Sequence, residues 1–162
     1  WSDMTQSLSD AALKVLGQGT GISHMEWFRR KDGSLAISEI AARPPGAQIM
    51  GLMSYSTDKD FFLAWAELMV HDTFTPPVRK YAAGVAFFRA MGKGRVKRVT
   101  GLDEAQKRVG HLVMDVKLPT VGQAPVSGYE GEGWAIVRAE DTATVDEALR
   151  ILITTVRIEL EV

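Results

Sequence analysis

The chain has 162 residues, of which 46% are hydrophobic and 24% charged, as is normal for a globular protein of one domain or two small lobes. Its net charge of −1 argues against a protein built mainly to hold nucleic acid or an anionic membrane, and the lack of cysteine excludes disulfides and thiolate metal sites. No apolar run approaches the ~20 residues of a membrane span, and no signal peptide is visible, so the cytoplasm is the expected compartment.

The first elements in chain order are a helix and a hairpin. Apolar residues at helical spacing predict a helix over residues 3–16, and a glycine-rich turn follows it. Residues 22–29 and 35–43 alternate between apolar and polar side chains, which predicts two strands. Asp32-Gly33 between them predicts a tight antiparallel hairpin.

Two more helices are predicted over residues 47–55 and 59–70. Aromatic and aliphatic residues of the second helix are expected to form its buried face rather than a ligand platform. These residues are Phe61, Phe62, Trp65, Leu68 and Met69.

From Val78 the pattern changes to short strands with two helices. Strands are predicted at residues 78–90, 94–101, 111–119, 134–140 and 156–162. The helices are predicted at residues 102–110 and 144–155, the second opened by Thr144 with Glu147 as a capping box. Residues 78–162 should therefore form one small antiparallel sheet with two helices.

The predicted fold class is α+β, with one domain over residues 1–77 and a small α+β domain over residues 78–162. The chain begins at Trp1 and enters directly into a helical pattern, so we expect a fragment of a longer protein. Basic residues in the second domain are interpreted as a solvated strand edge, because no aromatic residues interleave them as in nucleic-acid sites. They are Lys93, Arg95, Lys97 and Arg98.

The hairpin carries two glutamates, Glu26 and Glu39. A two-residue turn at Asp32-Gly33 places them directly opposite each other, with Cβ atoms roughly 4.5–5.5 Å apart. A three- or five-residue loop would shift the register by one residue and remove this opposition. The other pairs of the predicted register are Phe28 with Ile37, His24 with Ala41, and Ile22 with Arg43.

Two opposed carboxylates repel each other and need a compensating partner. Three are considered: a hard divalent cation such as magnesium, a shared proton, or nearby surface cations. The surface cations would be Arg29, Arg30 and Lys31. Because the same face continues to Arg43, a cation suited to binding carboxylate or phosphate, a ligand site is favoured.

The segment "HMEWF…DG…EIAARPPG" resembles the metal-binding hairpin of the ATP-grasp superfamily, the carboxylate–amine ligases that use ATP. This resemblance implies that Glu26 and Glu39 hold Mg²⁺, or Mn²⁺, on the phosphates of ATP. It also implies that Arg43 binds phosphate or a substrate carboxylate. Ala41 stands where the family usually has a metal-binding Asn. The segment "EIAARPPGA" resembles the amino-acid (dipeptide) ligase branch, where that Asn is often absent, so the number of metal ions stays open. His24 commonly precedes the first acid in this branch, and the residues alone assign it no role.

The resemblance extends over the whole chain. Residues 1–77 resemble the C-terminal half of an ATP-grasp core, and residues 78–162 resemble the small C-terminal domain of biotin-carboxylase-like members. The implied whole protein forms an acyl phosphate from ATP and a carboxylate, then an amide with an amine. Its nucleotide lysines and phosphate loop would lie in missing N-terminal domains of the same chain.

Two other functions stay open at this stage. The chain could be a non-catalytic domain that binds a nucleotide or a partner, or part of a magnesium-dependent hydrolase. No nucleic-acid or membrane partner is expected, and a homodimer is left open.

Overall fold

A computed structural model describes residues 3–161 of the chain. Trp1, Ser2, the Met4 side chain and Val162, the last residue of the predicted strand 156–162, lie outside the described residues. The chain divides into two compact units, unit 1 (Trp1–Gly46 with Phe61–Pro76) and unit 2 (Ala47–Asp60 with Pro77–Val162). None of the described helices is long and apolar enough to cross a membrane.

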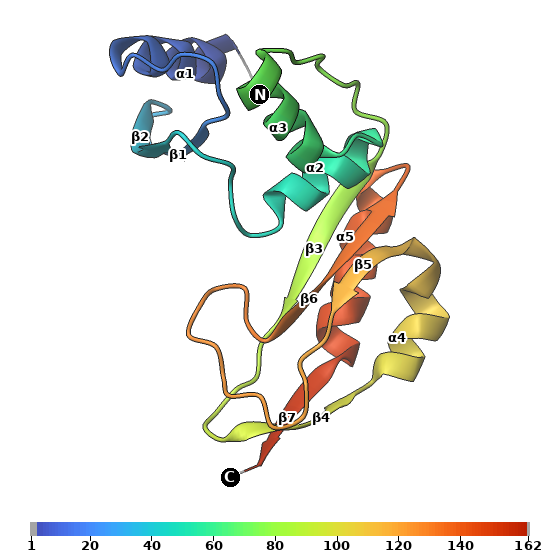
Figure 1. Ribbon diagram of the computed structural model, residues 1–162. Helices are drawn as coiled ribbons and strands as arrows, with labels where there is room; N and C mark the ends of the chain where they lie inside the picture. Colours follow the sequence, from blue (N-terminus) through green and yellow to red (C-terminus); the bar gives the residue numbers. More distant parts are fainter. Residues whose placement is uncertain (1–2, 162) are drawn as a thin grey trace. The chain divides into compact units, whose positions relative to one another are not determined.

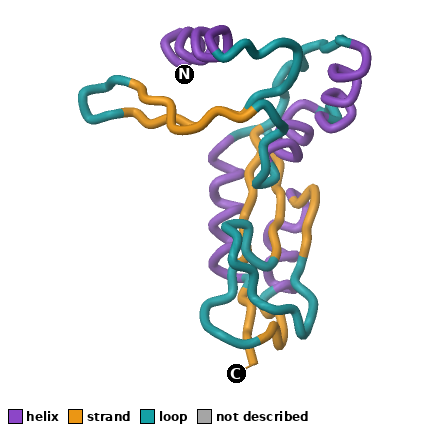
Figure 2. Tube along the Cα trace, turned by 60° about the vertical axis from the view of Figure 1, so that its left-hand side comes forward, coloured by secondary structure: helices purple, strands orange, loops and turns teal. Residues whose placement is uncertain are grey.

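The structure confirms the α+β class and every predicted helix and strand, with their ends shifted (Figures 1 and 2). The helices are α1 (Asp3–Val15), α2 (Ile49–Thr57), α3 (Phe61–His71), α4 (Leu102–Val109) and α5 (Thr142–Thr155), with a short 3₁₀ turn η1 (Gly110–Leu112). The strands are β1 (His24–Arg29), β2 (Leu35–Ala41), β3 (Ala82–Phe88), β4 (Arg95–Thr100), β5 (Val113–Lys117), β6 (Gly133–Ala139) and β7 (Arg157–Glu161).

Unit 1 contains α1, the β1–β2 hairpin and α3, and it buries little. The predicted buried face of α3 is wrong in part. Phe61 is 7% exposed and packs edge-on against the Phe74 ring, and Ala64 is buried, but Phe62 is 58% exposed and Trp65 is 36% exposed. Phe61 and Ala64, three residues apart on one side of the helix, are the buried residues of α3.

Unit 2 is built on a three-stranded antiparallel sheet in the order β3-β6-β5. Helix α5 packs on one face, over Gly84, where an added Cβ would lie 2.7 Å from Leu149 Cδ1. Gly84 pairs with Val137, so the neighbouring Ile136 points to the opposite face, where it meets Gly51 of α2. The sheet therefore carries helices on both faces.

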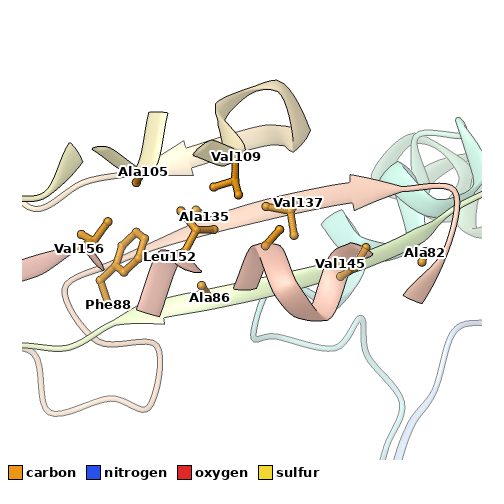
Figure 3. Packing of buried hydrophobic residues seen from close by; sticks show 11 residues of the cluster. Ala82, Ala86, Phe88, Ala105, Val109, Ala135, Val137, Val145, Leu152 and Val156 are labelled. Carbon is orange, nitrogen blue, oxygen red and sulfur yellow. The ribbon is translucent and has the colours of Figure 1, made fainter. Parts of the chain in front are cut away.

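The hydrophobic core of unit 2 lies between this sheet, α4 and α5 (Figure 3). Small residues dominate it, which lets the helices approach the strands closely. Its buried members are Ala82, Ala86, Phe88, Ala105, Val109, Ala135, Val137, Val145, Ala148, Leu152 and Val156.

Strands β4 and β7 form a separate two-stranded sheet, so the expectation of one sheet in this half was wrong. Arg98 donates to the Glu159 carboxylate at 2.7 Å, and Arg95 lies opposite Glu161. The hydrogen bond from Arg98 holds the pKa of Glu159 below its usual range. The glutamates of β7 thus oppose two of the positive charges of β4.

The start of α5 also differs from the prediction. Its N-cap is Asp141, whose carboxylate accepts hydrogen bonds from the backbone N–H and the hydroxyl of Thr144. Thr144 is therefore inside the helix, and the predicted capping box with Glu147 is wrong. An aspartate three residues before a threonine satisfies the free N–H groups of the first turn equally well.

Candidate functional site

The turn of the β1–β2 hairpin has three residues, not the predicted two. The Arg30 N–H donates to the Ser34 carbonyl at 2.8 Å, and the Gly33 N–H donates to the Arg30 carbonyl at 3.0 Å. Gly33 takes a left-handed conformation with φ 85°. Asp32 accepts hydrogen bonds from the hydroxyl and N–H of Ser34, which lower the pKa of Asp32.

This three-residue turn shifts the register beside it, but a bulge further along shifts the register back. Near the turn Phe28 pairs with Ala36, not with the predicted Ile37. Between Trp27 and Glu26 the partner changes from Ile37 to Glu39, so that Ser38 is the extra residue of a β-bulge. The predicted pairs Glu26–Glu39 and His24–Ala41 are therefore confirmed, although the turn from which they were derived is wrong.

The structure brings Arg43 close to one of the two carboxylates, that of Glu39. Glu26 and Glu39 are both exposed, and Arg43 Nη2 lies 4.0 Å from Glu39 Oε1 with both side chains 55% exposed. Arg43 Nη1 also donates to the Pro44 carbonyl at 3.1 Å. Since β2 ends at Ala41, Arg43 is not in the ladder opposite Ile22 and instead reaches back along the strand toward Glu39.

The loop after Pro44-Pro45-Gly46 has an unusual backbone. Ala47 and Gln48 are both left-handed, with φ of 52° and 62°, a conformation that costs non-glycine residues of order 1 kcal/mol each. The Ala47 N–H donates to the Glu130 carboxylate at 3.0 Å. Nothing in the sequence pattern signalled this feature.

His24 is the third polar residue on this part of the hairpin. It lies two residues before Glu26 and opposite Ala41, so strand alternation places it on the same face as the glutamates. Its Nδ1 is shielded from solvent and has no hydrogen-bond partner among the described residues.

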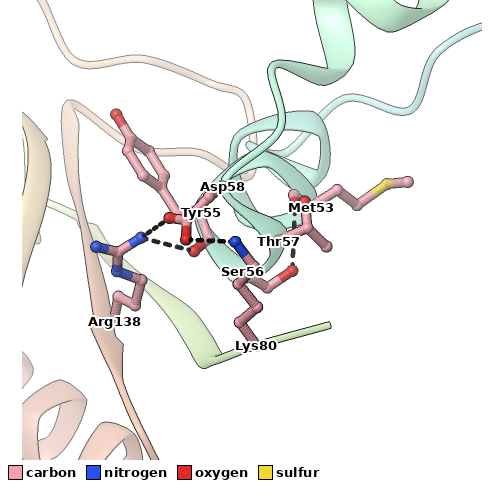
Figure 4. Close-up of polar contacts among 7 residues, drawn as sticks. All are labelled: Met53, Tyr55, Ser56, Thr57, Asp58, Lys80 and Arg138. Carbon is pink, nitrogen blue, oxygen red and sulfur yellow. Dashed lines mark hydrogen bonds and ion pairs between the residues drawn. The ribbon is translucent and has the colours of Figure 1, made fainter. Parts of the chain in front are cut away.

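A polar cluster in unit 2 escaped sequence reasoning because its members are far apart in the chain (Figure 4). Arg138 of β6 donates to Asp58 at 2.5 Å and to the Tyr55 carbonyl at 3.2 Å, and its guanidinium lies 4.2 Å from the Tyr81 ring centre. Lys80 also binds Asp58, at 3.2 Å. These contacts tie the end of α2 to β6 and to the segment before β3.

The donor set of the hairpin fits magnesium shared with phosphate oxygens. Among residues 3–161, no group of three or more histidine, aspartate or glutamate side chains is placed to hold a metal ion. The hairpin can therefore supply two carboxylates and no complete protein cage. Magnesium is typically bound by one or two carboxylates together with substrate phosphates, and such a pair suits it.

Comparisons with solved structures reveal the fold. The chain matches an L-amino acid ligase from Bacillus licheniformis with a TM-score of 0.78 at 18% identity, covering 100% of this chain and 44% of that one. It also matches N5-carboxyaminoimidazole ribonucleotide synthetase from Thermotoga maritima with a TM-score of 0.73 at 19% identity, covering 99% of this chain and 42% of that one. Phosphoribosylglycinamide synthetase from Anaerococcus prevotii matches with a TM-score of 0.74 at 14% identity, covering 98% of this chain and 42% of that one.

These matches define a fold: the chain has the architecture of the C-terminal portion of ATP-grasp enzymes, as the resemblance implied. It spans less than half the length of each of the three matched chains. No protein-family model and no curated protein matches it.

Proposed function

We propose that this chain is the C-terminal part of an ATP-dependent carboxylate–amine ligase. Glu26 and Glu39 would be its magnesium-binding carboxylates and Arg43 its anion-binding residue. The observation that carries the proposal is the Glu26–Glu39 pair, with Arg43 4.0 Å from Glu39, on a chain with an ATP-grasp fold. Residues 1–77 would be the C-terminal lobe of the grasp, and residues 78–162 the small domain that follows.

The proposed reaction has two steps. A substrate carboxylate attacks the γ-phosphorus of ATP, forming an acyl phosphate and releasing ADP. An amine then attacks the acyl carbon and displaces phosphate, leaving an amide. Glu26 and Glu39 would hold the magnesium ion, which would supply positive charge near the phosphates during transfer.

The residues of the chain would act by positioning and charge. Glu26 and Glu39 supply oxygen ligands from adjacent strands, whose ladder fixes their separation. Arg43 could bind a phosphoryl group or a carboxylate through two N–H groups, and its Nη2 lies 4.0 Å from Glu39. Pro44 and Pro45 restrict the backbone that follows Arg43.

The test uses the intact protein with Glu26→Gln, Glu39→Gln and the control Glu67→Gln, an exposed glutamate of α3. Each hairpin variant should lower ATP-dependent amide formation by about 10²-fold or more, while the control stays at the wild-type rate. Circular dichroism should show that all three variants fold. Unchanged turnover in Glu39→Gln would remove the assignment.

A non-catalytic nucleotide-binding domain is the alternative outcome of the same test. In that case, Mg-ADP binding would depend on Glu26 and Glu39, but no mixture of carboxylates and amines would make the intact protein release phosphate from ATP.

A further inference from the structure

Unit 2 has a surface hollow that the proposed function leaves unused. It lies where β3 and α5 end and β7 begins, and its volume is about 350 Å³. Phe88 and Val156, two buried side chains of the core cluster that Figure 3 labels, belong to its lining. Ile153, which is 53% exposed, and Ile158 add further apolar surface. The hollow is therefore large enough to enclose part of a small organic molecule.

Two arginines line this hollow, and both are held by backbone carbonyls. Arg157 Nη1 donates to the carbonyls of Ile153 at 2.7 Å and Val156 at 3.0 Å, at the C-terminal end of α5. Arg89 Nη2 donates to the Gly128 carbonyl at 2.6 Å. A guanidinium carries five N–H donors, so each arginine keeps donors that these carbonyls do not use. The carbonyls orient the two guanidinium groups without neutralising their charge.

No carboxylate neutralises either arginine within residues 3–161. Neither arginine forms an ion pair there, and no aspartate or glutamate lines the hollow. Glu159 of β7 accepts a hydrogen bond from Arg98 at 2.7 Å. The buried Glu132 carboxylate accepts the backbone N–H groups of Ala90 at 2.7 Å and Val126 at 3.0 Å. The carboxylates of this region thus have other partners, and the hollow carries two positive charges.

We propose that this hollow binds a small amphiphilic anion, whose charged oxygens contact Arg89 and Arg157 and whose apolar part packs against Phe88 and Ile153. Guanidinium groups form strong, charge-assisted hydrogen bonds with carboxylate and phosphate oxygens. The apolar side chains beside them favour a ligand that also carries an alkyl or aryl group, because its burial removes apolar surface from water. Carboxylates and phosphate monoesters of this kind share the required chemistry.

Small probes separate the contribution of charge from that of apolar surface. Hexanoate and phenyl phosphate carry both an anionic and an apolar group, hexanol lacks the charge, and inorganic phosphate lacks the apolar group. In titration calorimetry with the intact protein, hexanoate or phenyl phosphate should bind at least about tenfold more tightly than hexanol and inorganic phosphate. The tighter of the two binders identifies the preferred anionic group as carboxylate or phosphate.

Substitutions test whether the arginines hold the ligand. Arg89→Gln and Arg157→Gln should each weaken binding roughly 10- to 100-fold, the range of a hydrogen bond to a charged group. Arg150→Gln, an exposed arginine of α5 outside the hollow, is the control and should leave binding unchanged. Because Arg157 also holds the end of α5, Ile153→Glu gives a second test. Its negative charge should weaken binding strongly, whereas Ile153→Gln should weaken it less.

Methyl spectra of ¹³C-isoleucine-labelled protein locate the binding. The signals of Ile153 and Ile158 should move when the tighter probe is added, and that of Ile37 in β2 should not. Equal affinities for wild type, Arg89→Gln and Ile153→Glu would overturn the proposal, as would hexanol binding as tightly as hexanoate and phenyl phosphate. Glu39→Gln should leave this binding unchanged, because every residue that lines the hollow belongs to unit 2.

Discussion

At the residue scale, the two glutamates of the hairpin are not equivalent. Glu39 has Arg43 within 4.0 Å, whereas Glu26 faces Glu39 across the ladder, and both are exposed. An exposed ion pair contributes little, and directly opposed like charges are unfavourable by ~0.2–1 kcal/mol. Without metal, the pair should therefore weaken the hairpin, as is common where a site is arranged for a ligand.

Glu26→Gln should raise the metal-free melting temperature slightly, because it removes the repulsion and keeps the contact between Arg43 and Glu39. Glu39→Gln should raise it less, because it removes both. Thermal denaturation with and without Mg-ADP checks this, and both variants should lose the stabilisation that Mg-ADP confers on wild type. A lower metal-free melting temperature in Glu26→Gln would mean that the carboxylates do not repel each other in the protein.

Asp58 shows how a single exposed carboxylate can tie distant segments together. Hydrogen bonds from Lys80 and Arg138 hold the pKa of Asp58 below its usual value of 3.8. Folding therefore favours the charged form. The resulting stabilisation is complete above the unfolded-state pKa of about 3.9 and is lost as the pH falls through the lower pKa of the folded state.

Asp58→Asn should thus be less stable than wild type near neutral pH, and the difference should shrink once the pH falls below about 3.9. Urea denaturation at a series of pH values measures it. Asp146→Asn, an exposed carboxylate of α5, is the matched control and should show little difference at any pH. A destabilisation by Asp58→Asn that persists unchanged in acid would mean that the charge of Asp58 is not what holds the cluster.

At the element scale, α5 depends on the lack of a side chain at Gly84. A Cβ there would lie 2.7 Å from Leu149 Cδ1 and 2.8 Å from Val145 Cγ1, too close for ordinary contact. Val145 is in the buried core, so the helix cannot move away without opening that core.

Gly84→Ala should destabilise the protein by about 1–3 kcal/mol, the usual cost of overpacking. Gly19→Ala is the control, because a Cβ at Gly19 meets nothing within 4 Å. Chemical denaturation followed by circular dichroism compares the two variants. Equal stability of Gly84→Ala and wild type would show that α5 can shift on the sheet.

At the scale of the whole molecule, burial is unevenly distributed. The core cluster lies in unit 2, whereas in unit 1 Phe61 and Ala64 are the only apolar residues that are buried among those the structure describes. A two-stranded hairpin is only marginally stable without a packed face. The proposed magnesium-binding residues thus belong to the less buried of the two units.

Hydrogen exchange should reflect this difference. Without ligand, amides of β3 and β6 should be the most protected, and those of β1 and β2 should exchange much faster, because local opening of the hairpin uncovers little apolar surface. Mass spectrometry of peptides from both regions measures it. Equal protection of β2 and β6 would contradict the expectation.

The helices, the strands and the glutamate pair could be derived from the sequence, because they depend on local periodicity and on strand alternation. The α+β class, every helix and strand, and the pairs Glu26–Glu39 and His24–Ala41 were all predicted correctly. The two pairs were right because two deviations cancel. The turn at Asp32-Gly33 is not the predicted two-residue turn, and the bulge at Ser38 restores the register.

The features that join residues distant in the chain became visible only in the folded protein. It split the second half into two sheets, left Phe62 and Trp65 exposed, and gathered Tyr55, Asp58, Lys80 and Arg138 into one cluster. It also left Nδ1 of His24 enclosed, with no hydrogen-bond partner in the part of the chain that the structure describes. Burial and long-range hydrogen bonds depend on which segments contact each other in the folded protein. Local sequence patterns do not specify those contacts.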